Sequence, residues 1–115
     1  RQKKYRHNNI LVIGKQTRDF THIDDCIKTF ELVEKKIKGY EIFNSSKGDD
    51  TKIINLAKII KRLYKSKSKI KLIRVPNNLS EFQVKKRCGN SNKLLSYINF
   101  KPTKSLIEGL KQTYF

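Results

Sequence analysis

The sequence predicts a small α/β protein, and two observations support this fold class. Short runs of β-branched and aliphatic residues alternate with longer segments in which apolar residues recur every three or four positions. The predicted order is strand, helix, strand, helix, strand and then two helices. A length of 115 residues fits a single domain. Three short strands leave the faces and edges of their sheet uncovered, which indicates an incomplete α/β unit that completes a larger sheet.

The first predicted strand occupies residues 10–13, an aliphatic run that Gly14 ends. A helix follows it, with Thr21 as a suitable N-cap and Asp24 in the position of a capping-box acid. Gly39 is a reasonable stop for this helix. We expect its apolar stripe to face the core. The stripe consists of Ile23, Cys26, Ile27, Phe30, Val33 and Ile37.

A second strand is predicted at residues 41–44, and a cluster of turn residues follows it at 45–50. Asp50 or Thr51 then caps a second helix. The apolar residues of this helix recur at helical spacing and are expected to point inward. They are Ile53, Leu56, Ala57, Ile60, Leu63 and Tyr64.

The last third of the chain is predicted to hold one strand and two helices. The strand lies at residues 70–73, and residues 77–87 have no clear period and are expected to form a loop. Asn90 or Ser91 caps a short helix, and Thr103 caps the final one. The final helix is expected to bury Leu106, Ile107, Leu110 and Tyr114.

The charge composition is strongly basic, with a formal net charge of +17. Lysine supplies 21 of the 27 basic residues, and lysines occur in every segment. This scatter is typical of a solvated surface, so nucleic acid is not the expected partner. Two alternatives stay open: a stand-alone basic domain that binds nucleic acid or another polyanion, and a folded remnant without a ligand.

Cysteine, histidine and hydropathy patterns argue against several classes of site. Cys26, Cys88, His7 and His22 have no metal-ligand spacing, so no metal site is expected. Reduced thiols and a cytoplasmic location are expected. The longest apolar run, residues 10–13, is far shorter than the roughly 18 residues of a membrane span. No signal-peptide pattern is present.

Three motifs in order resemble one enzyme family. They are QTRDFTHIDD at residues 16–25, EIFNSSKGDDT at 41–51, and NSNK at 90–93 with FKPTKSLIEGL at 100–110. The family is the extended short-chain dehydrogenase/reductases, which are NAD-dependent nucleotide-sugar epimerases and dehydratases such as UDP-glucose 4-epimerase. The resemblance runs from about Ile10 to the end of the chain. It implies the C-terminal, substrate-binding part of a Rossmann-type enzyme, in which the strand at 41–44 joins the dinucleotide-binding sheet.

The resemblance also implies the chemistry of the parent enzyme. There, NAD takes a hydride from the sugar, a tyrosine moves the proton, and a lysine four residues later lowers the pKa of that tyrosine. This sequence contains no GxxGxxG turn for the pyrophosphate, so we expect the dinucleotide-binding domain to be a separate partner and this chain alone to hold no NAD. A homodimer is expected in the parent enzyme. Whether the chain itself is an enzyme stays open.

No catalytic residue is expected in this chain. Tyr97 and Lys101 have the spacing of the family's catalytic pair. However, Lys101 precedes Pro102, which disfavours a continuing helix, and the segment matches the family's LGWxP motif instead. Tyr97 is therefore expected to be a core residue.

Arg18 is the main candidate for substrate binding. From the residues alone, its guanidinium either forks onto a phosphate or pairs with Asp19, Asp24 or Asp25. The resemblance favours binding, because the family's arginine at this position contacts substrate phosphate. A UDP-sugar is the expected substrate.

Two further residues are weaker candidates. Val12 matches a position where the family reads the nucleotide base through backbone groups, although a core strand residue explains it equally well. The family often has a second phosphate-binding arginine in an RxGDV segment, and that arginine falls on Ser80 here. Arg87 is the candidate replacement.

Overall fold

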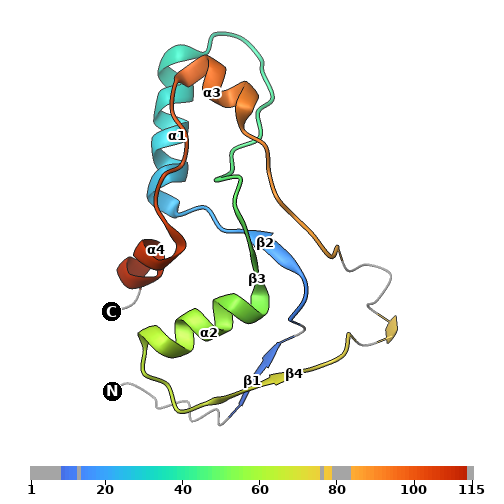
Figure 1. The fold of residues 1–115 in the computed structure, drawn as a ribbon. Helices are drawn as coiled ribbons and strands as arrows, with labels where there is room; N and C mark the ends of the chain where they lie inside the picture. Colours follow the sequence, from blue (N-terminus) through green and yellow to red (C-terminus); the bar gives the residue numbers. More distant parts are fainter. Residues whose placement is uncertain (1–8, 13, 76, 79–83, 114–115) are drawn as a thin grey trace. The chain divides into compact units, whose positions relative to one another are not determined.

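A computed structural model describes residues 9–12, 14–75, 77–78 and 84–113 of the chain (Figure 1). The predicted α/β class is confirmed. Contacts divide the chain into two compact units. The first unit comprises Arg1–Gln16 and Lys52–Lys85, and the second comprises Thr17–Thr51 and Lys86–Phe115. The expectations for Ser80 and Tyr114 lie outside the described residues.

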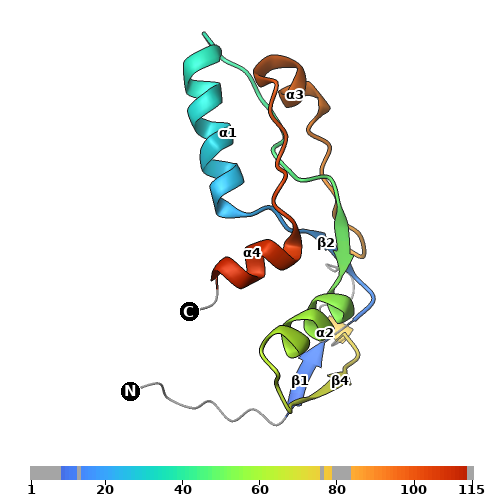
Figure 2. The same ribbon diagram turned by 60° about the vertical axis from the view of Figure 1, so that its left-hand side comes forward.

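The first unit contains a two-stranded parallel sheet and one helix. Strand β1 (Asn9–Val12) pairs with β4 (Lys69–Leu72), with Ile10 opposite Ile70. Helix α2 (Ile53–Leu63) lies beside both strands (Figures 1 and 2). Parallel strands need a crossover connection, and α2 belongs to the connection between these two. Two of the predicted strands are therefore confirmed, each shifted by about one residue.

The start of α2 differs from the prediction. Its N-cap is Lys52, which makes no side-chain capping hydrogen bond. The first amides of the helix are satisfied by the backbone instead, because Ile53 donates to the carbonyl oxygen of Gln16 at 3.0 Å and Ile54 to that of Gly14 at 3.3 Å. The predicted caps, residues 50–51, belong to a short strand.

The second unit contains three helices and a small sheet. Strand β2 (Thr17–Asp19) pairs with β3 (Asp50–Lys52), and an isolated parallel bridge joins Thr17 to Lys86. Helix α1 (Ile23–Lys36) packs along α3 (Asn92–Ile98), and α4 (Leu106–Thr113) ends the described chain. The core between α1 and α3 contains Leu94, Ile98 and Thr29, each at most 2% exposed.

Helix α1 presents a different face to the core from the one predicted. Its buried residues are Asp25 and Thr29, whereas Ile23 is 62% exposed and Phe30 is 67% exposed. Thr29 can be buried because its hydroxyl donates to the carbonyl oxygen of Asp25 at 2.9 Å. The N-cap is His22, whose Nδ1 atom accepts from the amide of Asp24. The prediction of Thr21 as the cap is wrong by one residue.

The strand predicted at residues 41–44 is not formed. This segment has no regular secondary structure, and Ile42 within it is 68% exposed. A strand requires a neighbour for its backbone groups, and no described strand pairs with this segment. The segment is instead anchored by Lys93, whose Nζ atom lies 2.8 Å from an Oε atom of Glu41 and donates to the carbonyl oxygen of Ile42.

The two C-terminal helices are confirmed with one corrected cap. Ser91 is the N-cap residue of α3, and the amide of Asn92 donates to Oδ1 of Asn90 at 2.9 Å. Helix α4 begins later than predicted, because Ser105 and Glu108 form a reciprocal capping box and Thr103 does not cap it.

Candidate functional site

The structure brings together two of the predicted site residues, Arg18 and Arg87. Arg18 lies in β2, and its Nη1 atom donates to the carbonyl oxygen of Thr17 at 2.6 Å. The backbone amide of Arg87 donates to the same carbonyl oxygen at 3.3 Å. One backbone oxygen is therefore the shared anchor of two residues that carry guanidinium groups, 69 positions apart in the sequence.

The acidic residues near Arg18 accept hydrogen bonds from other donors. The Oδ2 atom of Asp19 accepts from the amides of Gly48 at 2.8 Å and Gly89 at 3.1 Å. The carboxylate of Asp24 lies 2.6 Å from the Nζ atom of Lys104. These carboxylates therefore have structural hydrogen bonds of their own.

Two polar atoms beside Arg18 are buried and have no hydrogen-bond partner among the described residues. They are the Oγ1 atom of Thr17 and the Oδ1 atom of Asp19. An unsatisfied buried oxygen is destabilising, so atoms of this kind often mark places where a further polar group binds.

Val12 lies in a different unit from the two arginines. It is the last residue of β1, where its Cα partner is Leu72 of β4. Its place in a parallel ladder agrees with the interpretation as a strand residue. A role of its backbone in reading a base stays a prediction.

Hydrogen bonds between distant segments hold the second unit together. The hydroxyl of Thr21 accepts from the amide of Lys47 at 3.0 Å. The hydroxyl of Ser91 accepts from the amide of Ser46 at 2.7 Å and donates to its carbonyl oxygen at 2.9 Å. Together with the Asp19 bonds, these contacts join all three sequence motifs. Sequence reasoning named Ser91 only as a helix cap and missed its contact with Ser46, because no periodicity marks a contact 45 positions apart.

A second set of contacts positions the start of α1. The backbone amide of Lys104 donates to the Oδ2 atom of Asp25 at 3.0 Å. The hydrogen bond from Lys104 also lowers the pKa of the Asp24 carboxyl below its ordinary value. Asp24 and Asp25 therefore act as structural acceptors. Sequence reasoning missed Lys104.

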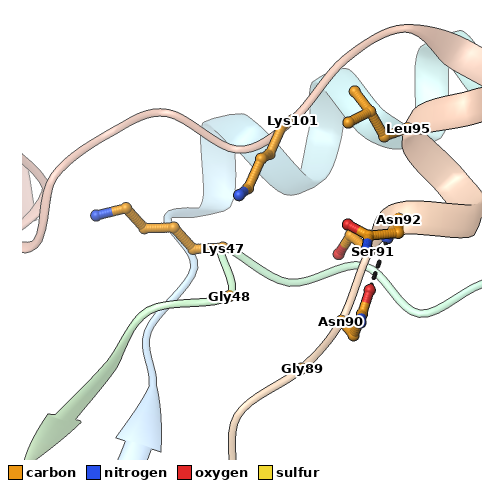
Figure 3. Close-up of a pocket in the computed structure, with 8 residues that line it drawn as sticks. All are labelled: Lys47, Gly48, Gly89, Asn90, Ser91, Asn92, Leu95 and Lys101. Atoms are coloured by element: carbon orange, nitrogen blue, oxygen red, sulfur yellow. Dashed lines mark hydrogen bonds between the residues drawn. The ribbon is translucent and has the colours of Figure 1, made fainter.

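Two hollows lie within the second unit. One has a volume of about 180 Å³ and is lined by residues 47–48 and 89–92 with Leu95 and Lys101. Figure 3 shows the Lys101 side chain reaching toward the segment of Lys47 and Gly48. The other, of about 150 Å³, is lined partly by His22 and Leu106. Neither lining includes Arg18 or Arg87.

The rejected catalytic pair is not on one helix. Helix α3 ends at Ile98, and Asn99 adopts a left-handed conformation with φ of 51° before Lys101. Tyr97 is 46% exposed and is not the core residue predicted; its ring packs edge-on against Phe43 at 5.1 Å.

The described residues contain neither the ligand cluster of a metal site nor a helix that could span a membrane. They contain no group of three or more histidine, cysteine or acidic side chains arranged to hold a metal ion. Within the same part of the chain, every helix is too short or too polar to cross a bilayer.

The chain is similar to known proteins in sequence and in structure. No protein-family model matches the sequence. The chain is 36% identical over 101 residues to UDP-glucuronate 4-epimerase of Thermodesulfobacterium geofontis, covering 87% of this chain and 30% of that protein. It is 33% identical over 105 residues to UDP-N-acetyl-alpha-D-glucosaminuronate decarboxylase of Bacillus cytotoxicus, covering 87% of this chain and 32% of that protein.

A solved structure of an epimerase also resembles this chain in fold. UDP-glucose 4-epimerase of Thermotoga maritima, determined with UDP-glucose, matches with a TM-score of 0.78 at 26% identity, covering 91% of this chain and 32% of that one. The chain thus spans about a third of the length of these relatives. In sequence and in fold, it corresponds to the C-terminal portion of an NAD-dependent nucleotide-sugar epimerase/dehydratase of the extended short-chain dehydrogenase/reductase family.

Proposed function

We propose that this chain is the substrate-binding part of an NAD-dependent enzyme acting on a nucleotide sugar, and that Arg18 grips the diphosphate of that sugar. The observation that carries the proposal is the shared anchor of Arg18 and Arg87 on the carbonyl oxygen of Thr17. Arginine presents a planar fork of donors that matches phosphate oxygens. Arg87, on the adjacent segment, carries the second positive charge that Ser80 cannot provide.

The substrate class is a UDP-sugar. The names of both sequence relatives specify UDP-linked sugars, and the solved epimerase was determined with UDP-glucose. A charged hydrogen bond from Arg18 to a phosphate oxygen contributes on the order of 1.5–3 kcal/mol.

The sequence has no glycine-rich turn opening a helix, the feature that holds the pyrophosphate of a dinucleotide. We therefore assign NAD and the hydride chemistry to a partner dinucleotide-binding domain. The unpaired segment at 41–44 and the exposed face of α1 support such a partner.

A nuclear magnetic resonance titration tests the grip directly. We expect millimolar UDP-glucuronate to shift the backbone amide signals of Thr17, Arg18 and Arg87 in the full chain. Arg18→Ala abolishes these shifts, whereas Lys28→Ala, at an exposed position on α1, leaves them unchanged. Shifts that are the same in the wild type and in Arg18→Ala would contradict the proposal.

A further inference from the structure

The positive charge is unevenly divided between the two units. The first unit has fifteen basic residues and one acidic residue among 50 positions, which gives a net charge of +14. The second has twelve basic and nine acidic residues among 65 positions, which gives +3. Lysines that look scattered along the sequence are therefore concentrated once the chain folds. Residues 52–80 contain nine basic residues and no acidic residue.

The cations of the first unit have no acidic partners in the described structure. The five ion pairs among the described residues all join residues of the second unit. Like charges at close spacing repel one another and destabilise the folded state unless counter-charge is bound. The positive charge of the first unit is therefore not neutralised by ion pairs among its described residues.

Four of these cations occupy every second position between the end of α2 and β4, and we call them the basic ridge: Lys65, Lys67, Lys69 and Lys71. All four are exposed. Alternate residues of a strand share a face, so Lys69 and Lys71 lie on one side of β4. Leu72 faces the other way, because its side chain lies against Gly14, close to Ile54 of α2. Lys69 and Lys71 thus lie on the sheet face away from the helix, whereas Lys65 and Lys67 lie in the turn and the irregular segment that precede β4.

We propose that the basic ridge binds the phosphate backbone of a nucleic acid without reading its sequence. The ridge consists of lysines, which bind phosphate as point charges, and it lacks the arginine forks that read base edges. Ser66 and Ser68 lie between the lysines in the sequence, and the hydroxyl oxygen of Ser66 accepts from the backbone amide of Ser68 at 3.2 Å.

The test is fluorescence anisotropy of a 20-nucleotide single-stranded RNA of mixed sequence, titrated with the full chain across a range of NaCl concentrations. In the ridge variant, all four lysines are changed to Gln. The matched control changes four exposed lysines of the second unit to Gln: Lys35, Lys38, Lys101 and Lys111. Both variants lose four positive charges, so a difference in their RNA affinity shows that the position of the lysines matters and not only the net charge.

We expect the ridge variant to bind RNA about tenfold or more weakly, and its slope of log affinity against log salt to be shallower by about 3, since each lost contact to a single strand contributes about 0.7. The control variant loses less than about threefold. Replacing the four ridge lysines by Arg retains binding, which separates loss of charge from misfolding.

Three results would overturn the inference. The first is an equal loss of affinity in the ridge and control variants. The second is no RNA binding by the wild type at 0.1 M salt. The third is binding to vesicles containing phosphatidylserine in the absence of RNA binding. Arg18→Ala is expected to leave RNA affinity within about twofold, so this test is independent of the proposed grip on a nucleotide sugar.

Discussion

The Nζ atom of Lys104 lies 2.6 Å from the Oδ2 atom of Asp24, and this contact ties the segment before α4 to the first turn of α1. The same lysine donates its backbone amide to Asp25. Two neighbouring acidic residues at a helix start are thus used as acceptors for one lysine 80 positions away. Their negative charge also suits the positive end of the helix dipole.

The stability of the fold should decline in acid, in part through Asp24. The hydrogen bond from Lys104 lowers the pKa of this carboxyl below 3.8 in the folded state. Because the pKa of Asp24 is lower in the folded state than in the unfolded state, its ionised carboxylate stabilises the fold fully at any pH above the unfolded pKa. This stabilisation is lost as the pH falls through the folded pKa. Urea unfolding midpoints measured from pH 6 down to pH 2 should fall, and Asp24→Asn should flatten this dependence.

Glu108 adds to the same acid dependence. The backbone amide of Ser105 lowers the pKa of its carboxyl below 4.5, and the sign of the effect is the same. The double variant with Asp24→Asn and Glu108→Gln should therefore show a weaker dependence than either single variant. A steep acid dependence that survives in the double variant would place the responsible groups elsewhere.

Asp25→Ala should destabilise the second unit more than a change at an exposed carboxylate. Asp25 is 7% exposed, and its loss leaves the amide of Lys104 without its acceptor. The expected cost is about 1–3 kcal/mol, which urea unfolding at pH 7 can measure. Asp49→Ala is the control, because its contact with Lys47 spans 3.6 Å at an exposed position. It should change stability by less than about 0.5 kcal/mol. Equal effects would show that the Asp25 bond contributes little.

A matched pair of serine substitutions tests the contact between two of the motifs. Ser91 is 7% exposed, and its hydroxyl bonds both backbone groups of Ser46. Ser91→Ala should cost about 1–3 kcal/mol, because the Ser46 amide loses its acceptor. Ser96 is exposed and bonds only the carbonyl of Lys93 within its own helix, so Ser96→Ala should change little. Thermal unfolding of both variants gives the comparison, and the prediction fails if they unfold alike.

Local patterns in the sequence predicted the four helices and two of the four strands, but not what surrounds them. The helical spacing of apolar residues located α1 and α2 within a few residues, because this spacing is a property of residues that are close in the sequence. The same period assigned the wrong face of α1 to the core: Ile23 and Phe30 are exposed, whereas Thr29 is buried. A polar Thr29 is tolerated there because its hydroxyl donates to a backbone carbonyl within its own turn, and hydrophobic period does not detect such a bond. The prediction of a strand at residues 41–44 was wrong for a related reason, because a strand forms only where a neighbouring strand pairs with its backbone groups.

The substrate-binding roles of Arg18 and Arg87 stay predictions. The motif resemblance singled out Arg18, and Arg87 was named as a replacement for a missing arginine. The structure adds the shared contact with Thr17 that relates them. Lys104 and Ser46 could not be found from the sequence, because their partners lie 79 and 45 positions away and neither spacing has a local signature.

The last prediction separates charge from geometry at Arg18. A chimera in which this chain replaces the matching third of the Thermodesulfobacterium UDP-glucuronate 4-epimerase provides a catalytic readout. Arg18→Lys keeps the charge but loses the planar fork, so it should raise KM for UDP-glucuronate several-fold, and Arg18→Ala should raise it about tenfold or more. Binding of NAD, followed by its absorbance, should be the same in both variants.

Lys28→Gln is the control for this experiment, because Lys28 pairs at 3.6 Å with Glu31 on the exposed face of α1. It should leave KM unchanged. If Arg18→Ala raised KM no more than Lys28→Gln did, the guanidinium would not contact the substrate, whatever the activity of the chimera. If Arg18→Lys matched the wild type, charge alone would explain the grip and the fork geometry would have no role.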